Sequence, residues 1–326
     1  MSFFSFYLFR LALESKVFFI LIALTKEVAS MKRILTFLMS CILSSYALAF
    51  DSVERIAIVC AFQPEIPELK AALKNPKIET VGRTQFITGQ IGNKNVVLFL
   101  SGMSMVNAAM TTQLALDHFN IKNIVFSGIA GGVNPQLNIG DVSVPEQWGQ
   151  YLESIMARQS NGKFVPPTFL STPYPNFGMM FPQNVQIANG SQAPEQKFWF
   201  HVDPNLMAQA KQLLANTKLD RCTSTQHCLS HTPKVVFGGN GVSGQSFMDN
   251  AELRQYVHQT FNANVVDMES AAVGHVAYTN QVPFIVFRSL SDLAGGGAGE
   301  NEEGTFFELA AKNSSKLVIQ YVSALK

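Results

Sequence analysis

From residue 55 onward, short apolar runs alternate with segments whose apolar residues recur every three or four positions. The short runs predict strands at 56–60, 96–100, 124–127, 141–144, 235–237, 264–267 and 283–287. The periodic segments predict helices at 64–73, 103–119, 204–214, 251–261, 269–278 and 305–324. A strand at 84–91 pairs with 96–100 as a hairpin, and Gly128 to Gly132 predict a glycine-rich turn. The alternation predicts one α/β domain, with a twisted, mixed and mostly parallel sheet flanked by helices.

Residues 149–232 differ from the rest of the chain in composition and in their pattern of apolar residues. They are rich in proline, asparagine and glutamine, and only the helix at 204–214 has a regular apolar period. We therefore expect a long irregular insertion over the active face of a domain that spans residues 50–326. A second domain would need an apolar pattern of its own.

The first part of the chain reads as a targeting signal. Met31-Lys32-Arg33 is a basic start, residues 34–43 are apolar, and Ala47-Leu48-Ala49 is a small-residue cleavage motif. This pattern predicts a signal region at 1–49 with cleavage after Ala49, and translation that begins at Met31. A lipid anchor on Cys41 is a weaker alternative, because Met39 fits such a site poorly. The expected location is periplasmic or secreted.

Charge and composition narrow the function classes. The net charge is +1 and charged residues make up 14% of the chain, so the sequence has no basic stripe for nucleic acid. After the signal region no apolar run has the length of a membrane span. We expect a soluble, exported protein with a full hydrophobic core.

Two cysteines lie close together in a loop. Cys222 and Cys228 flank five polar residues, and in an oxidising compartment such a pair predicts a disulfide. The alternative is a zinc site formed by this pair with His227 and His231. Export favours the disulfide, and we expect neither a metal nor an organic cofactor.

The segment Gly239 to Gly244 has the glycine spacing of a phosphate-binding loop. Its G-x-G-x-x-G spacing follows a strand, with Asp267 downstream, as in dinucleotide-binding folds. A P-loop would need lysine where Gln245 stands, and the next helix begins too late to meet a pyrophosphate. We expect instead that these glycines admit a flat ligand, which Phe247 covers.

Two carboxylates stand at strand ends. Glu269 follows the strand at 264–267, and Asp292 follows the strand at 283–287. Ligands of α/β sheets bind at such ends, so this pair suits a polar ligand whose bond breaks with proton transfer. The alternative is that both acids only favour helix N-termini.

With these elements placed, the chain resembles the purine nucleoside phosphorylase and nucleosidase superfamily. It is most similar there to 5′-methylthioadenosine/S-adenosylhomocysteine nucleosidases and their exported relatives, which include plant storage-type proteins. The resemblance rests on Ala61 to Ile66, Ser101 to Met103, Ser127 to Gly132, Val242 to Gly244 with Phe247-Met248, Asp267 to Glu269, and Arg288 to Asp292.

The resemblance implies a role for each matching residue. Glu65 corresponds to the base that activates water, and Asp292, oriented by Ser291, to the acid at purine N7. Glu269 corresponds to the residue on the ribose hydroxyls. The remaining implied substrate contacts are Ser101, Gly131, Phe247, Met248, Met268 and Arg288.

The chemistry of a purine N-glycosidic bond explains these residue types independently. The base leaves poorly unless N7 is protonated, and a buried carboxylic acid can supply that proton. Positive charge develops on the ribosyl ring, as in glycoside hydrolysis, and a carboxylate at its hydroxyls stabilises that charge. A second carboxylate then deprotonates the attacking water.

Three functions fit this resemblance. A phosphorylase needs cationic groups around phosphate, whereas residues 62–65 and 101–106 contain no lysine or arginine. Hydrolysis of adenine-type nucleosides such as methylthioadenosine is therefore favoured, without a cofactor and in a homodimer as the resemblance implies. Non-catalytic nucleoside binding or storage is the third possibility. Gln63-Pro64 and the glycine-rich segment 293–301 depart from the usual nucleosidase pattern and leave the 5′ substituent open.

Overall fold

The computed structural model describes residues 51–190 and 192–326, and the structural statements below concern these residues. The predicted signal region 1–49, with Met31 and Cys41, lies outside them. Residues 51–326 form one compact unit. No helix in the described ranges is long and apolar enough to cross a membrane.

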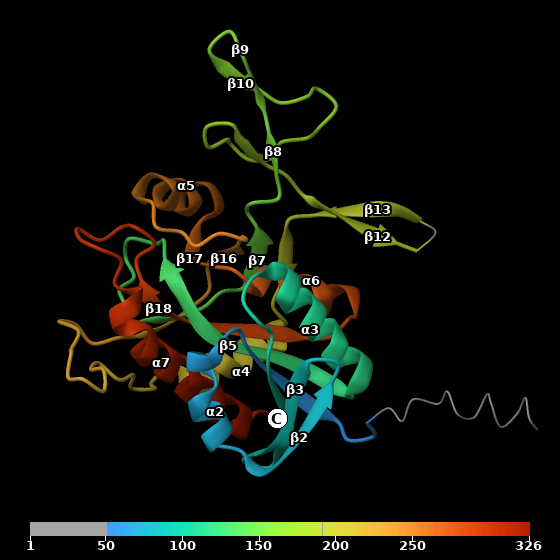
Figure 1. Cartoon of the computed structure of the whole chain (residues 1–326), viewed down its shortest axis with the longest axis vertical. Coiled ribbons are helices and arrows are strands. Elements are labelled where there is room, and N and C mark those ends of the chain that lie inside the picture. Colours follow the sequence, from blue (N-terminus) through green and yellow to red (C-terminus); the bar gives the residue numbers. More distant parts are fainter. Residues whose placement is uncertain (1–50, 191) are drawn as a thin grey trace, which may run out of the picture. The chain divides into compact units, whose positions relative to one another are not determined.

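A mixed sheet forms the centre of this unit (Figure 1). Its strands in the described residues are β1 (Arg55–Cys60), β2 (Lys74–Val81), β3 (Thr84–Ile91), β4 (Lys94–Leu100), β5 (Ile121–Gly132), β6 (Val142–Val144), β7 (Gln147–Gln150), β14 (Trp199–His201), β15 (Val235–Phe237), β16 (Asn240–Ser243), β17 (Ala263–Asp267) and β18 (Phe284–Asp292). β1 pairs parallel to β4 and β5, and β18 pairs parallel to β5, whereas β17 pairs antiparallel to β5. Their apolar side chains, such as Ile58, Val125 and Ile285, are fully buried, because helices cover the sheet.

The helical elements are η1 (Gln63–Glu65), α2 (Pro67–Ala71), α3 (Met105–His118), α4 (Pro204–Leu214), α5 (Ala251–Phe261), α6 (Ser270–Thr279) and α7 (Glu303–Ala324). α7 packs along β18 and β5, and α3 packs against α6. The Asn250 side chain begins α5 by accepting a hydrogen bond from the Leu253 backbone N–H at 2.8 Å. These packings confirm the predicted α/β class.

The structure divides residues 149–232 between the domain and a projecting arm. β7, β14 and α4 belong to the main unit, and Tyr151 and Phe200 are fully buried there. The arm contains two short antiparallel pairs, β8 (Ser154–Met156) with β11 (Met180–Pro182) and β9 (Arg158–Ser160) with β10 (Lys163–Val165). A separate hairpin of β12 (Val185–Asn189) with β13 (Gln192–Lys197) buries Val185 and Ile187 in the main core. In Figure 1, β9 and β10 extend away from the sheet. The insertion is therefore shorter and more regular than its composition indicated.

Several element predictions needed correction. Residues 128–132 are the second half of β5 and not a turn, because their partner β18 continues beside them as far as Asp292. The helix expected at 64–73 is two short pieces, since Pro67 has no backbone N–H to continue the first. β2 was missed because its side chains are almost all exposed, so it has no apolar run.

Candidate active site

A pocket opens where β1 and β17 end, beside the last residues of β5 and β18. Five of its lining residues carry a carboxylate, and the rest are apolar or small. The lining consists of Ala61, Phe62, Glu65, Met103, Ile129, Ala130, Gly131, Ser246, Phe247, Met248, Val266, Asp267, Met268, Glu269, Ser291, Asp292 and Glu303. The three acids predicted from the sequence, Glu65, Glu269 and Asp292, thus share one cavity.

Glu65 reaches the pocket from η1, just after β1. One of its oxygens, Oε2, accepts hydrogen bonds from the backbone N–H groups of Ala61 at 2.6 Å and Phe62 at 3.3 Å. The other, Oε1, accepts from the Ile129 N–H at 2.9 Å. Burial raises the pKa of Glu65, while Arg288 and these N–H groups oppose that rise. A carboxylate with a raised pKa suits a general base.

Glu269 stands at the N-terminal end of α6, next to Asp267 at the end of β17. Its Oε1 accepts a hydrogen bond from the Ser104 backbone N–H at 2.7 Å. Ser104 donates from a left-handed backbone conformation, with φ of 76°, which is uncommon for a residue with a side chain. Burial raises the pKa of Glu269 to about 7, and the neighbouring charges of Asp267 and Glu65 add to the rise.

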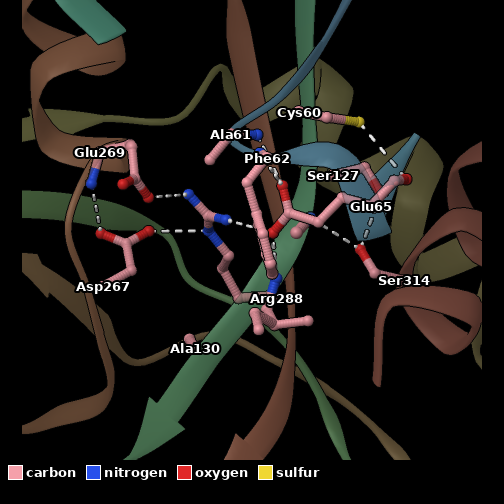
Figure 2. Close-up of polar contacts among 12 residues, drawn as sticks. Cys60, Ala61, Phe62, Glu65, Ser127, Ala130, Asp267, Glu269, Arg288 and Ser314 are labelled. Carbon is pink, nitrogen blue, oxygen red and sulfur yellow. Dashed lines mark hydrogen bonds and ion pairs between the residues drawn. The ribbon is translucent and has the colours of Figure 1, made fainter. Parts of the chain in front are cut away.

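Arg288 of β18 connects these acids, as Figure 2 shows. Its Nε lies 2.7 Å from Asp267 Oδ2, its Nη2 lies 3.3 Å from Glu269 Oε2, and its Nη1 lies 3.6 Å from Glu65 Oε1. The guanidinium also stacks 4.1 Å from the centre of the Phe126 ring. Arg288 is fully buried behind the lining, so it contacts the carboxylates and does not line the pocket.

The position of the Arg288 guanidinium explains why residue 128 of β5 is glycine. A Cβ at this position would lie 1.8 Å from Arg288 Nη1 and 2.6 Å from Glu65 Oε1. Only a residue without a side chain lets the guanidinium cross the strand here. Gly128 therefore makes room for the ion-pair cluster within a continuous strand.

Asp292 occupies the other end of the pocket in a different environment. Its Oδ2 accepts a hydrogen bond from the Ser291 hydroxyl at 2.9 Å, and its Oδ1 accepts from the Ala294 backbone N–H at 2.7 Å. The Asn301 amide also donates to Oδ1, at 3.4 Å. No ion pair among the described residues involves Asp292.

Apolar side chains form the remaining wall. Met248 is buried, whereas Phe247 is 60% exposed and Met103 is 58% exposed. Together with Met268 and Val266 they present flat, apolar surface of the kind on which a heterocycle packs. No described residue of 149–232 is in the lining, so the described part of the insertion predicted to lie over the active face does not contribute to this pocket.

Ser101, Arg288 and the glycines from Gly239 to Gly244 lie outside the pocket lining, although the sequence predicted that each would contact or admit the ligand. Ser101 lies outside the pocket, because Gly102, with φ of +80°, turns the chain and presents Met103 to the pocket instead. The glycines from Gly239 to Gly244 do not admit a ligand. A Cβ at Gly241 would lie 2.6 Å from the Trp148 ring, and one at Gly244 would lie 2.6 Å from Leu152, so these glycines serve packing.

Sequence reasoning also missed functional candidates. Asp267 was considered only for a dinucleotide, yet it holds Arg288 and accepts a hydrogen bond from the Ser270 hydroxyl. Phe62, Met103 and Glu303 line the pocket but stand outside the predicted contacts. The adjacent pair Glu302-Glu303 before the last helix was the available signal for Glu303.

Cys222 and Cys228 form a disulfide, as predicted. The bond removes both thiolates from the alternative zinc site with His227 and His231. Cys60 is a buried free thiol, as its place inside β1 indicated.

Comparison with known proteins identifies the family. Residues 55–323 match the family model described as the Phosphorylase superfamily, and the chain belongs to that family. It is 30% identical over 271 residues to the 5′-methylthioadenosine/S-adenosylhomocysteine nucleosidase of Staphylococcus epidermidis, covering 83% of this chain and 100% of that one. It is 28% identical over 236 residues to bark storage protein B of Populus deltoides, covering 68% and 72%.

A solved structure agrees with this assignment. The 5′-methylthioadenosine/S-adenosylhomocysteine nucleosidase of Neisseria meningitidis, in complex with methylthio-immucillin-A, superposes with a TM-score of 0.63. The two chains are 24% identical, and the match covers 84% of this chain and 100% of the other. This likeness supports the fold.

Proposed function

We propose that this protein hydrolyses the N-glycosidic bond of purine nucleosides of the adenine type, such as methylthioadenosine, and releases the free base. The observation that carries the proposal is the convergence of Glu65, Glu269 and Asp292 on one pocket. The names of the relatives support the substrate class, since the Staphylococcus epidermidis protein is a methylthioadenosine nucleosidase.

The proposed mechanism gives each carboxyl group one task. Asp292 donates a proton to purine N7 as the bond from N9 to C1′ breaks, so the base leaves neutral. Glu269 accepts hydrogen bonds from the ribose hydroxyls and stabilises the positive charge on the sugar. Glu65 takes a proton from the water whose oxygen bonds to C1′. The products are the free base and the free sugar.

The neighbours of these acids fit supporting tasks. Ser291 orients Asp292 through its 2.9 Å hydrogen bond, and Arg288 holds Glu65 and Glu269 apart in fixed positions. Phe247, Met248 and Met268 provide surface for the base and the sugar, and Gly131 lets the ligand approach β5.

Water is a better nucleophile than phosphate for this pocket. Its lining contains five acids and, among the described residues, no lysine, arginine or histidine. The buried guanidinium of Arg288 already pairs with three carboxylates. A phosphate dianion would therefore meet repulsion without compensating donors.

The surface around the pocket supports a homodimer. Val106 is 66% exposed and Met110 is 60% exposed on α3, next to the exposed Met103 and Phe247. Clustered apolar side chains of this kind favour association, and a second copy here would cover the pocket mouth. Analytical ultracentrifugation of Val106→Glu should show monomers where the wild type shows dimers.

We also propose that the protein is exported from the cytoplasm. The signal pattern at 31–49 supports it, and the Cys222–Cys228 disulfide fits an oxidising compartment. Fractionation of cells that express the full chain should place the processed protein outside the cytoplasm.

Nucleoside binding without turnover is a second candidate, suggested by the similarity to a relative named as a storage protein, although the nucleosidase relatives favour hydrolysis. One experiment separates the candidates. Purified protein is incubated with a panel of purine and pyrimidine nucleosides, with and without phosphate, and free base is measured. Base release that does not depend on phosphate supports hydrolysis, release only with phosphate supports phosphorolysis, and binding without release supports the storage function.

A further inference from the structure

The five carboxylates of the pocket are not equally neutralised. Arg288 pairs with Glu65, Asp267 and Glu269, at the end where Glu269 begins α6. Asp292 and Glu303 line the same pocket at the end nearest α7, and no described cation pairs with either. The α7 end of the pocket is therefore acidic without a counter-charge from the described chain.

Glu303 is held in place by its backbone and not by its carboxylate. As the first residue of α7, it donates its backbone N–H to Asn301 Oδ1 at 2.9 Å, and the amide of Asn301 reaches Asp292 at 3.4 Å. The described hydrogen bonds and ion pairs include none to the Glu303 carboxylate. This carboxylate is half-buried in the lining and available to a ligand.

We infer that Glu303 is a specificity-determining residue, which makes this pocket favour nucleosides with a positively charged substituent, such as a protonated amine, and disfavour anionic ones. The inference rests on the proposed nucleosidase function. It adds the charge class of the substrate to that function.

The position of Glu303 indicates which part of a nucleoside it meets. If Asp292 binds the base edge and Glu269 the ribose hydroxyls, the 5′ substituent is the group left to reach the solvent side of the pocket. Glu303 is half-buried, whereas Asp292 is only 4% exposed, so Glu303 lies nearer to solvent.

Electrostatics indicate which ligand charge the α7 end of the pocket should favour. Burial raises the pKa of Glu303, and the negative charge of Asp292 raises it further, so the ionised form is disfavoured in the empty pocket. A ligand cation near both carboxylates offsets this cost, and a ligand anion adds to it. Because Glu303 is partly exposed, solvent screens its interaction with a ligand charge. We therefore expect the preference for a cationic over a neutral substituent, and for a neutral over an anionic one, to be roughly tenfold each, or about 1.4 kcal/mol.

The test compares three adenosine derivatives that differ at the 5′ position. These are 5′-amino-5′-deoxyadenosine, neutral 5′-deoxyadenosine and adenosine 5′-carboxylate. We measure kcat and KM for base release, and Kd by calorimetry, with wild type, Glu303→Gln and the control Glu302→Gln. Glu302 is the exposed neighbour of Glu303 and lies outside the pocket.

Wild type should prefer the amine over the neutral compound, and the neutral compound over the carboxylate, by roughly tenfold at each step, mainly in KM and Kd. Glu303→Gln should flatten both ratios, and Glu302→Gln should keep them. Equal ratios in wild type and Glu303→Gln overturn the inference while base release upholds the proposed function. If no compound is cleaved, the proposed function fails, and the Kd ratios still decide whether Glu303 selects charge.

Discussion

The two ends of the pocket hold their carboxylates in different ways. At one end, the buried Arg288 lies among Glu65, Asp267 and Glu269, and backbone N–H groups fix the acids further. At the other end, the donors to Asp292 among the described residues are the neutral groups of Ser291, Ala294 and Asn301.

This difference matches the two halves of the proposed reaction. A buried cation fixes carboxylates in place and so suits the groups that must stabilise charge on the sugar and activate water. A carboxyl group bound by neutral donors can pass a proton to a ligand without breaking an ion pair. The comparison predicts that damage at the Arg288 end harms both folding and turnover, whereas damage at the Asp292 end harms turnover alone.

The largest expected effect on folding is that of Arg288→Met. Three buried carboxylates would lose their shared cation, so we expect the free energy of unfolding to fall by about 3–5 kcal/mol. Urea denaturation measures this loss. The matched control is Lys122→Met, which removes an exposed ion pair with Glu54 and should cost less than about 1 kcal/mol. Equal costs for both variants would show that the buried cluster has no special role in stability.

Gly128→Ala should produce a smaller loss of the same kind. The added methyl group must displace the guanidinium and the Glu65 carboxylate, at a cost of roughly 1–3 kcal/mol. Gly304→Ala is the control, since nothing lies within 4 Å of a Cβ there. Thermal unfolding should separate the two variants, and an unchanged melting temperature for Gly128→Ala would contradict the close packing described here.

The pH dependence of turnover tests the carboxylates at the Arg288 end of the pocket. Burial raises the pKa of Glu269 to about 7, so this carboxylate becomes protonated as the pH falls below neutrality, and burial raises the pKa of Glu65 above its ordinary value as well. Because the proposed mechanism needs both ionised, kcat/KM for methylthioadenosine should fall about tenfold per pH unit once Glu269 protonates, and up to about hundredfold per unit where Glu65 protonates too. An acid limb centred near the ordinary glutamate value, about 4.3, would contradict this account.

Ser291→Ala should give the smallest effect. It removes the hydroxyl donor to Asp292 and leaves the backbone donor from Ala294, so we expect kcat to fall by roughly tenfold with stability nearly unchanged. Ser289→Ala, two residues earlier on β18, is the control and should keep the wild-type kcat. If both variants have the wild-type kcat, Ser291 does not position Asp292.

Much of the fold was predictable because its elements carry local signals. β15 and α5 have the boundaries that apolar spacing indicated, and the Asn250 cap marks where α5 begins. The glycine-rich half of β5 was misread as a turn, because the side chains that require its glycines, the Arg288 guanidinium at Gly128 and Leu290 at Gly132, are far away in sequence.

The candidate site was predictable to the same extent as the fold, namely where a local sequence signal marks the residue. Glu65, Glu269 and Asp292 were predictable from motifs, since Glu65 and Glu269 follow β1 and β17, and Asp292 is the last residue of β18. Ser101 was misplaced, and Met103 and Glu303 were missed, because a loop conformation and a helix start decide which side chains enter the pocket. Local periodicity contains no information on those choices.

The most direct test of the central claim measures single-turnover base release from methylthioadenosine by Glu65→Gln, Glu269→Gln and Asp292→Asn, each confirmed as folded. If the three carboxylates act on one bound nucleoside, each substitution should lower the rate by about 10²–10⁴-fold, while Asp117→Asn, at an exposed residue of α3 outside the pocket, keeps the wild-type rate. A wild-type rate in any of the three variants, or no base release by the wild type, would contradict the claim.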